Sequence, residues 1–212
     1  MNFYLVYDGP LSGSGNGGKP DEVRKIRDTF HGQLKLLWDT HKALLRLRST
    51  ARVAKEPRNY FGILTSPFET DDWRDQPLQE GFVDLCEPIK KGKSYIPLIR
   101  RSLDLSCHLE IFFLRQEDPG SLVLQGGDID NRIKTLFDAL RMPDPDVEAR
   151  HPQGDDPFYC LLESDTLISG FDVETGRLLF PESTAPNLVH LVIKVTVRVL
   201  KLGEWNICLM GD

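Results

Sequence analysis

Two long stretches of the chain alternate apolar and polar residues with a period of two. In residues 103–113, and again in residues 189–199, almost every second side chain is aliphatic, phenylalanine or cysteine. This alternation predicts strands with one buried and one solvent-facing side, as is typical of antiparallel sheets. Shorter apolar runs predict further strands over 2–8 and 166–172, and a turn over Glu174–Gly176.

Apolar residues three and four positions apart predict two helices. The first covers 21–56 as one long helix, and the second follows Asp130. The apolar stripe of the second helix consists of Ile133, Leu136, Phe137 and Leu140. The long helix carries the basic residues Arg24, Arg27, Lys35, Lys42, Arg46, Arg48 and Arg52. These form either a solvated face or a face that contacts phosphates, whereas His31 and His41 are expected to be packing or surface residues.

Together these elements indicate an α+β fold. We expect a single mixed, largely antiparallel sheet, with the long N-terminal helix and the short central helix packed on it. The 212 residues, 40% of them hydrophobic, suit one domain covering 1–212. Segments 57–101 and 142–157 are weakly patterned or rich in proline, so we expect them to be insertions. Within the first of them we expect a short strand at 60–64. Lys90–Lys93 is expected to be a loop tip that is either solvated or in contact with phosphates.

Taken alone, the net charge of −6 argues against a nucleic-acid binder, whose footprint is usually a basic patch, but the charge is segregated. Residues 21–58 carry ten lysines and arginines against five acidic residues. Residues 89–101 carry five basic residues and no acidic ones. In contrast, residues 59–88 and 141–175 are strongly acidic. The fold decides whether the two basic segments meet near an acidic site.

Cysteine spacing and hydropathy narrow the class of protein. Four cysteines lie far apart, at Cys86, Cys107, Cys160 and Cys208. This spacing indicates neither a zinc site nor a disulfide framework, and it fits a reducing compartment. No apolar run approaches the ~18 residues of a membrane span, and no basic leader precedes the first strand. We therefore expect a cytoplasmic protein with no membrane partner.

A glycine-rich loop follows the first strand. Gly13, Gly18 and Lys19 have the spacing of a phosphate-binding loop between a strand and a helix. Pro20 stands where such a loop needs a hydroxyl group for Mg²⁺, and it has no backbone N–H. A linker with proline at the first helical position explains the loop as well. Nucleotide binding is therefore an alternative function.

The start of the short central helix gathers the residues best suited to catalysis. Asp128 and Asp130 follow a glycine pair, and Lys134 lies one turn further on. Carboxylate oxygens bind Mg²⁺ or Mn²⁺, and an ammonium group nearby binds a phosphate or orients a water. The structural alternatives are a helix cap at Asp128 and an ion pair between Asp130 and Lys134. Asn131 either holds a water or completes the cap, and Asp138 is expected to be structural.

The composite of these residues is more specific than two neighbouring aspartates. It consists of Asp128-Ile129-Asp130-Asn131, Lys134 and Phe137-Asp138-Ala139-Leu140. This composite resembles the signature of the RusA-type Holliday junction resolvases. In that family a further aspartate precedes a strand, and Asp165 is the matching position. The resemblance implies a RusA-like fold and a homodimeric, Mg²⁺-dependent endonuclease that cuts four-way DNA junctions in recombination and repair.

The candidate site and its alternatives can now be stated. The catalytic residues are expected to be Asp128, Asp130, Lys134 and Asp165, and the three aspartates are expected to bind Mg²⁺ or Mn²⁺. The first function is a structure-selective endonuclease acting on branched or double-stranded DNA. The second is a catalytically silent module of the same fold that binds nucleic acid or protein. The third is a nucleotide-binding protein that uses the loop from Gly13 to Lys19.

Overall fold

The computed structural model confirms the α+β class. It describes residues 1–12, 20–54, 78, 80–116, 128–144, 157–179 and 188–210, with the backbone alone at Ala54 and Asp128. Within these residues the chain forms three α-helices and nine strands. The glycine-rich loop at 13–19 and the strand predicted at 60–64 lie outside the described residues.

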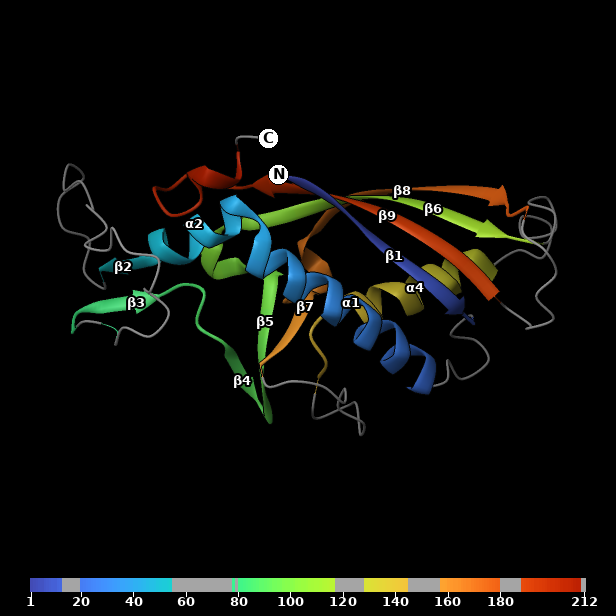
Figure 1. Cartoon of the computed structure of the whole chain (residues 1–212), viewed down its shortest axis with the longest axis horizontal. Helices are drawn as coiled ribbons and strands as arrows, with labels where there is room; N and C mark the ends of the chain where they lie inside the picture. The colour runs from blue at the N-terminus through green and yellow to red at the C-terminus, as the bar shows by residue number, and fades with distance from the viewer. Residues whose placement is uncertain are drawn as a thin grey trace.

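A four-stranded sheet forms the largest layer (Figure 1). Its strands in spatial order are β1 (Asn2–Pro10), β9 (Leu188–Val199), β6 (Leu105–Arg115) and β8 (Ile168–Arg177). β9 is antiparallel to both β1 and β6, whereas β6 and β8 are parallel. The strands predicted at the start, middle and end of the chain are confirmed, with small differences at their ends.

Two smaller sheets show that the prediction of a single sheet is wrong. In one, β5 (Lys93–Ile99) lies between antiparallel β4 (Ile89–Lys91) and parallel β7 (Phe158–Leu162). In the other, β2 (Arg52–Ala54) pairs with β3 (Phe82–Asp84). Most of these strands are short. Two of the pairings, β5 with β7 and β2 with β3, join distant parts of the chain. They therefore leave no long alternation that a sequence pattern would reveal.

The predicted long helix is interrupted. α1 (Pro20–Thr40) and α2 (Lys42–Thr50) are separated by His41, whose backbone is extended with φ −79° and ψ 120°. Strand β2 replaces the last predicted helical turn. Both helices bury their apolar side in the same core, through Trp38 before the break and Leu44 after it. The apolar spacing therefore continues across the break, which explains why one helix was expected.

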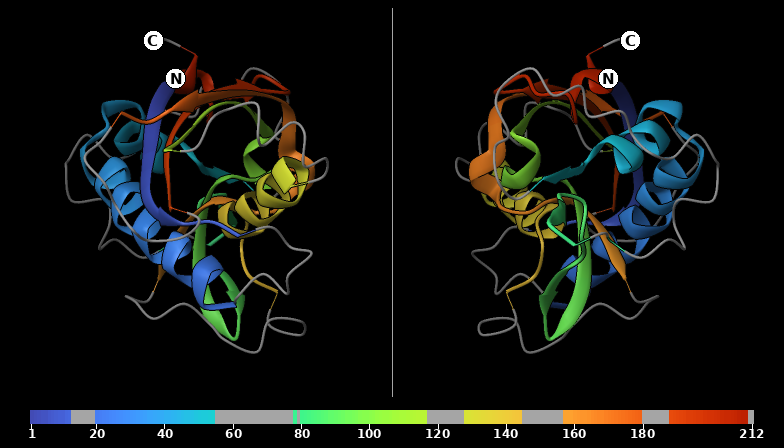
Figure 2. Two further views of the ribbon diagram at one scale, coloured as in Figure 1. Left: turned by 90° about the vertical axis from the view of Figure 1, so that its right-hand side faces the viewer. Right: turned by 90° about the vertical axis from the view of Figure 1, so that its left-hand side faces the viewer.

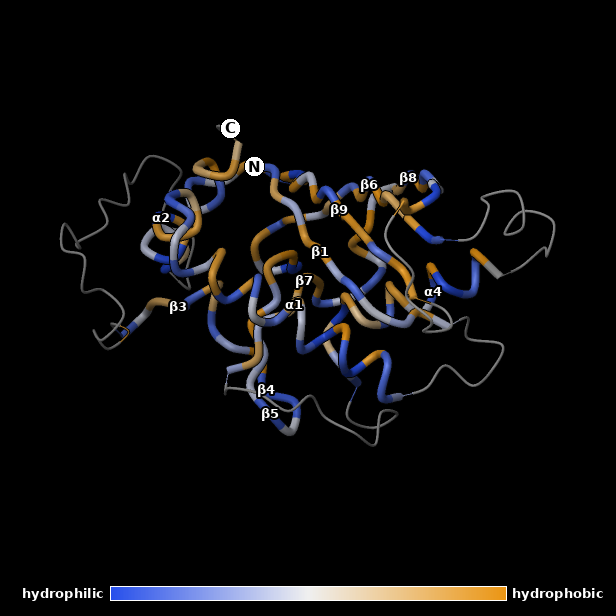
Figure 3. Tube along the Cα trace, turned by 45° about the vertical axis from the view of Figure 1, so that its right-hand side comes forward, coloured by the Kyte–Doolittle hydropathy of each residue, from blue (hydrophilic) through white to orange (hydrophobic). Residues whose placement is uncertain are grey.

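The main core lies between the four-stranded sheet and the helices. α1 and α4 (Asp128–Leu140) lie next to each other under the sheet (Figures 1 and 2). Apolar segments of the sheet and the helices gather in this interior (Figure 3). Three short 3-10 helices complete the described fold: η3 (Arg101–Leu103), η4 (Asp165–Leu167) and η5 (Ile207–Leu209). The sheet and α1 thus form the support on which α4 rests.

The turn predicted over Glu174–Gly176 is instead the end of β8. In the parallel ladder, Phe112 pairs with Glu174 and Leu114 pairs with Gly176. A Cβ atom on Gly176 would lie 2.8 Å from Leu114 Cδ2, so this glycine permits close packing against β6 rather than a turn. Long-range strand pairing has overridden the local turn signal.

Two arginines of the predicted basic helix face are structural. Arg27 is 4% exposed, and its guanidinium group donates to the carbonyl oxygen of Asp138 at 2.6 Å, which ties α1 to α4. Arg48 is also buried, and its guanidinium carbon lies 4.9 Å from the ring centroid of Trp38. The basic face is therefore divided between buried tethers and exposed residues such as Lys25.

His31 has a packing role, which is one of the two alternatives that were predicted. Its ring stacks on Phe158 with centroids 4.3 Å apart, and its Nδ1 accepts a hydrogen bond from the backbone N–H of Tyr159 at 2.9 Å. These contacts join α1 to β7. His31 is therefore part of the link between the helical layer and the smaller sheet.

The two predicted insertions are described only in part. Of 57–101, the described portion holds β3, β4, β5 and the start of η3. Lys90–Lys93 forms the predicted tip, a hairpin between β4 and β5 that projects from the body (Figures 1 and 2). Gly92 at this tip has φ 70°, which glycine adopts without steric cost. Of 142–157, residues 145–156 lie outside the described residues.

Candidate functional site

α4 is fixed in place by its buried side. Leu136 is fully buried, and Arg132, only 4% exposed, donates a hydrogen bond to the carbonyl oxygen of Leu11 at 2.7 Å. The arginine of α1 described above holds the last turn of the helix. Asp130 and Lys134, one turn apart, are exposed on the other side. Burial of one face thus presents a carboxylate and an ammonium group on the other.

Asp165 opens the η4 turn, which connects β7 to β8. Ser164 Oγ accepts a hydrogen bond from the backbone N–H of Thr166 at 3.3 Å and so caps the turn. The Glu163 carboxylate accepts from the backbone N–H of Arg101 at 2.8 Å. The turn is therefore held by its own cap and by η3, and it leaves the Asp165 side chain exposed.

A groove of about 670 Å³ runs between α4 and β8. It is lined by Ile129, Asp130, Ile133, Lys134, Phe137, Asp138, Asp165, Phe171, Asp172 and Val173. Three of the four predicted catalytic residues therefore line one groove, with Asp130 and Lys134 contributed by α4 and Asp165 by η4. Their catalytic role stays a prediction.

Charged residues in the groove differ in their partners. In the part of the chain that the structure describes, Lys134 takes part in no ion pair or hydrogen bond. The alternative of an ion pair with Asp130 is therefore not observed. Asp138, in contrast, accepts from Arg141 Nε at 3.1 Å, and its Oδ1 lies 3.1 Å from a terminal nitrogen of the same guanidinium group. Asp138 thus has the structural role that was predicted.

The groove offers part of the predicted metal-ligand set. Asp130 and Asp165 present carboxylate oxygens, which suit Mg²⁺ or Mn²⁺, and Mg²⁺ usually keeps several of its waters. Among the described side chains, no group of three His, Cys, Asp or Glu residues is arranged to hold a metal ion. Asp128 begins α4, but its side chain lies outside that set. The donors fit a hard cation in kind, and the three-aspartate site stays a prediction.

Sequence reasoning missed the contribution of β8. Phe171 is 48% exposed, and its ring meets that of Phe137 edge-on, with centroids 5.1 Å apart and planes at 84°. Asp172 follows it, with Oδ2 3.0 Å from His108 Nε2 on β6. The only sequence sign was an aromatic residue between a glycine and an aspartate, which is too slight to mark a site.

Arg101 is a second residue that sequence reasoning missed. A terminal guanidinium nitrogen lies 3.4 Å from Thr166 Oγ1, one residue after Asp165 in η4. Its neighbour Arg100 is buried instead and donates to the carbonyl oxygen of Glu87 at 2.9 Å. The basic segment 89–101 therefore reaches the edge of the acidic site through one exposed arginine.

The chain matches no protein-family model, no curated protein and no solved structure. The resemblance to RusA-type resolvases accordingly rests on the motif residues alone. In the described ranges, no helix has the length and apolar character needed to cross a membrane.

Proposed function

We propose that this chain is a metal-dependent, structure-selective DNA endonuclease that resolves four-way junctions in recombination and repair. The observation that carries the proposal is the shared groove of Asp130, Lys134 and Asp165. Hydrolysis of a phosphodiester needs a positioned water and positive charge near the phosphate oxygens. Two carboxylates and an exposed lysine in one groove are the residue types that meet these needs.

Each residue has a distinct task in the proposed reaction. Asp130 and Asp165, together with Asp128, would hold Mg²⁺ or Mn²⁺. A bound divalent ion supplies positive charge against the phosphate oxygens. Lys134 holds a phosphate oxygen or orients the attacking water with its ammonium group. Arg101, at the edge of the site, binds a neighbouring phosphate through charge-assisted hydrogen bonds.

The proposal includes a homodimer. Symmetric cuts at two points of one junction require two copies of the site, and a twofold dimer supplies them in matching orientation. Sedimentation of the free protein and of its complex with a junction measures this directly. A 1:1 complex of one chain with one junction would contradict this part of the proposal.

The function is tested by cleavage of labelled four-way junction, flap and linear duplex DNA in Mg²⁺ or Mn²⁺. Asp130→Asn is compared with Asp138→Asn, because Asp138 lines the same groove but is paired with Arg141. The proposal predicts paired, symmetric cuts in the junction that vanish only in Asp130→Asn. If only flap or duplex DNA is cut, nuclease activity is supported and junction resolution is rejected.

A catalytically silent binding module is the second candidate. Half of the ten groove residues are hydrophobic, which suits binding of a ligand as well as hydrolysis. This candidate predicts that wild type and Asp130→Asn bind DNA equally well and that neither cuts it. The same cleavage experiment, combined with a binding measurement, separates the two candidates.

A further inference from the structure

The lining of the groove is half apolar and half charged, and we refer to its apolar half as the floor. Half of the ten lining residues are hydrophobic: Ile129, Ile133, Phe137, Phe171 and Val173. A groove that contacts only the phosphates of a duplex is expected to be lined by basic and polar groups. We therefore expect the ligand of this groove to have an apolar part as well as a charged part.

Phe171 is the most exposed part of this floor. It lies on β8, an edge strand of the sheet, where β6 is the one neighbour within the described chain. The residue as a whole is 48% exposed, and the ring of Phe137 on α4 meets its ring edge-on. Edge-on support leaves a face of the ring free of that neighbour. This geometry suits a flat partner that stacks on the ring.

We propose that the groove binds an unpaired nucleotide of branched nucleic acid, with its base stacked on Phe171 and its phosphate directed to Lys134. This inference rests on the proposed function and names the structural feature of the substrate that is recognised. The groove volume of about 670 Å³ lies within the ~300–1,000 Å³ typical of ligand pockets. Lys134 makes no ion pair or hydrogen bond in the described part of the chain, so its ammonium group is available to the phosphate.

Stacking on Phe171 explains selectivity for structure without selectivity for sequence. Every base has an aromatic face, so an aromatic platform accepts all four. A base inside a continuous duplex must first be unpaired and unstacked, which costs free energy. This cost is lower for a nucleotide at a branch point. The groove therefore favours junctions and flaps over linear duplex, and we expect little base preference in binding.

The test measures DNA binding and not cleavage, with Ca²⁺ in place of Mg²⁺ or Mn²⁺. Junction, flap and linear duplex carry 2-aminopurine at the branch or at the matching duplex position, and affinity and fluorescence are read together. The variants are Phe171→Ala, Phe171→Leu, which keeps an apolar side chain without an aromatic face, and Phe171→Trp. Tyr4→Ala is the matched control, since Tyr4 is an aromatic residue 59% exposed on β1, at the opposite edge of the same sheet.

The proposal predicts that Phe171→Ala and Phe171→Leu each lower affinity for branched DNA about tenfold. Their affinity for linear duplex should change less than about twofold. Phe171→Trp should bind branched DNA as tightly as wild type does. Tyr4→Ala should change neither affinity. An equal loss on all three DNAs, or no loss on branched DNA, would overturn it. Conversion of a dimer to a monomer by Phe171→Ala would also overturn it, because the floor would then be covered by a second copy.

Failure of this inference can be told apart from failure of the proposed function. If Phe171 variants bind all DNAs like wild type while Asp130→Asn loses cleavage, the nuclease stands and base stacking is rejected. The opposite result is that wild type cuts no DNA, although its binding of branched DNA depends on Phe171. In that case base stacking is supported and catalysis is rejected.

Discussion

The partners of each charged side chain separate structural residues from candidate catalytic ones. Asp138 on α4 forms an ion pair with Arg141, the residue that follows the helix, and Arg27 donates to the carbonyl oxygen of Asp138. Lys134, within the described residues, makes no such contact. A residue that contributes little to folding but lines a groove is expected to affect activity more than stability.

Replacement of Lys134 by alanine is predicted to lower the cleavage rate about 100-fold, the effect typical of losing one donor to a developing negative charge. The melting temperature should stay unchanged, because no described hydrogen bond or ion pair is lost. Lys134→Arg should recover part of the rate. A clear fall in melting temperature, with cleavage intact, would show that Lys134 is structural.

Arg27 is predicted to behave in the opposite way. Arg27→Ala leaves a carbonyl oxygen of α4 without its donor, so it should lower the free energy of unfolding by about 1–3 kcal/mol. Lys25→Ala, an exposed change on the same helix, should alter it by less than ~0.5 kcal/mol. Urea denaturation measures both. Equal stability of the two variants would contradict the tether role of Arg27.

At the level of elements, the candidate site depends on the relation between α4 and η4. Amphipathic spacing was enough to predict α4 and its apolar side, because a helix that buries one face has apolar residues three and four positions apart. It was not enough to place Asp165 beside α4, since that depends on how β7 leads into β8. The RusA-type resemblance supplied Asp165 as a candidate, and the described structure puts it at the groove.

Elements held by distant pairing were the hardest to predict. β5 and β7 pair across more than fifty residues, and β2 pairs with β3 over a segment that is mostly undescribed. The end of β8 is extended because Gly176 packs against Leu114, although its sequence favours a turn. The break at His41 left no trace in the periodicity. In each case a tertiary contact decided the local structure.

The cap of η4 gives a prediction at this scale. Ser164→Ala removes the side-chain acceptor for the Thr166 N–H and should cost about 0.5–2 kcal/mol of stability. It should also weaken binding of Mn²⁺, because the turn no longer fixes Asp165. Ser169→Ala, which removes a bond from Ser169 Oγ to the carbonyl oxygen of Cys107, is the control. The expectation fails if both serine variants bind Mn²⁺ equally well.

For the whole molecule, buried titratable groups predict how stability depends on pH. Burial raises the pKa of Tyr7, Cys107 and Cys160 to about 12. The ordinary values are about 10 for tyrosine and about 8.5 for cysteine. Between these limits the unfolded chain releases protons that the folded chain keeps. Stability from these groups is therefore fully present below pH ~8.5 and is lost as the pH rises toward 12.

Urea denaturation between pH 7 and 10.5 checks this expectation. The free energy of unfolding should be level near neutral pH and fall progressively above pH ~8.5. Cys160→Ala is predicted to be less stable throughout, because it leaves a cavity, but to show a shallower fall. A level curve up to pH 10.5 would contradict the buried, protonated state of these groups.

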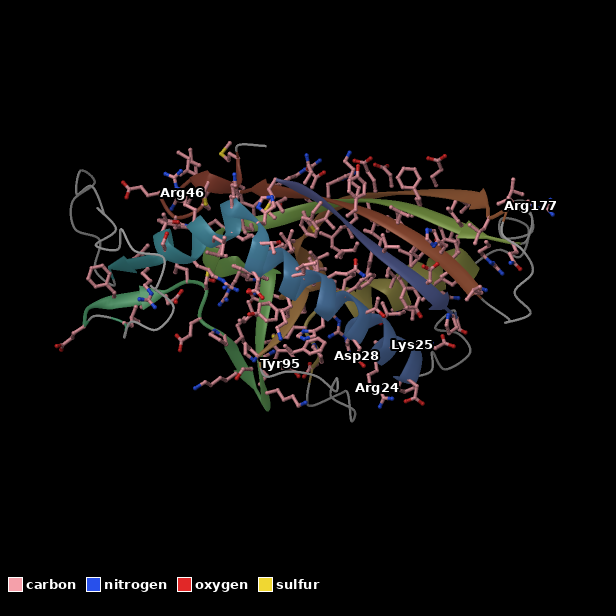
Figure 4. The ribbon with its side chains drawn as sticks, in the orientation of Figure 1. Arg24, Lys25, Asp28, Arg46, Tyr95 and Arg177 are labelled. Atoms are coloured by element: carbon pink, nitrogen blue, oxygen red, sulfur yellow. The ribbon has the colours of Figure 1, made fainter. Side chains whose placement is uncertain are left out.

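The basic residues labelled in Figure 4 do not lie in one patch of the described chain. Arg24 and Lys25 on α1, Arg46 on α2 and Arg177 at the end of β8 lie at separate places in Figure 4. The β4–β5 hairpin adds Lys90 and Lys91 at its projecting tip, and Arg101 lies nearer the groove. We therefore expect DNA binding to depend on a few phosphate contacts rather than on a broad basic surface.

Salt dependence tests the hairpin. If Lys90 and Lys91 each contact a phosphate, their double replacement by alanine should reduce the slope of log K against log salt concentration by about 2. Lys42→Ala with Arg46→Ala removes the same charge from α2 and should leave the slope nearly unchanged. Equal effects of the two double variants would indicate a general charge effect instead.

The central claim is that carboxylates from α4 and η4 act as one metal site. Binding of Mn²⁺ to the free protein, followed by electron paramagnetic resonance, tests it most directly, with Asp138→Asn as the control. We predict that Asp130→Asn and Asp165→Asn each abolish the same site, although the two residues belong to different elements, while Asp138→Asn keeps it. Undiminished Mn²⁺ binding in either of the first two variants would contradict the account.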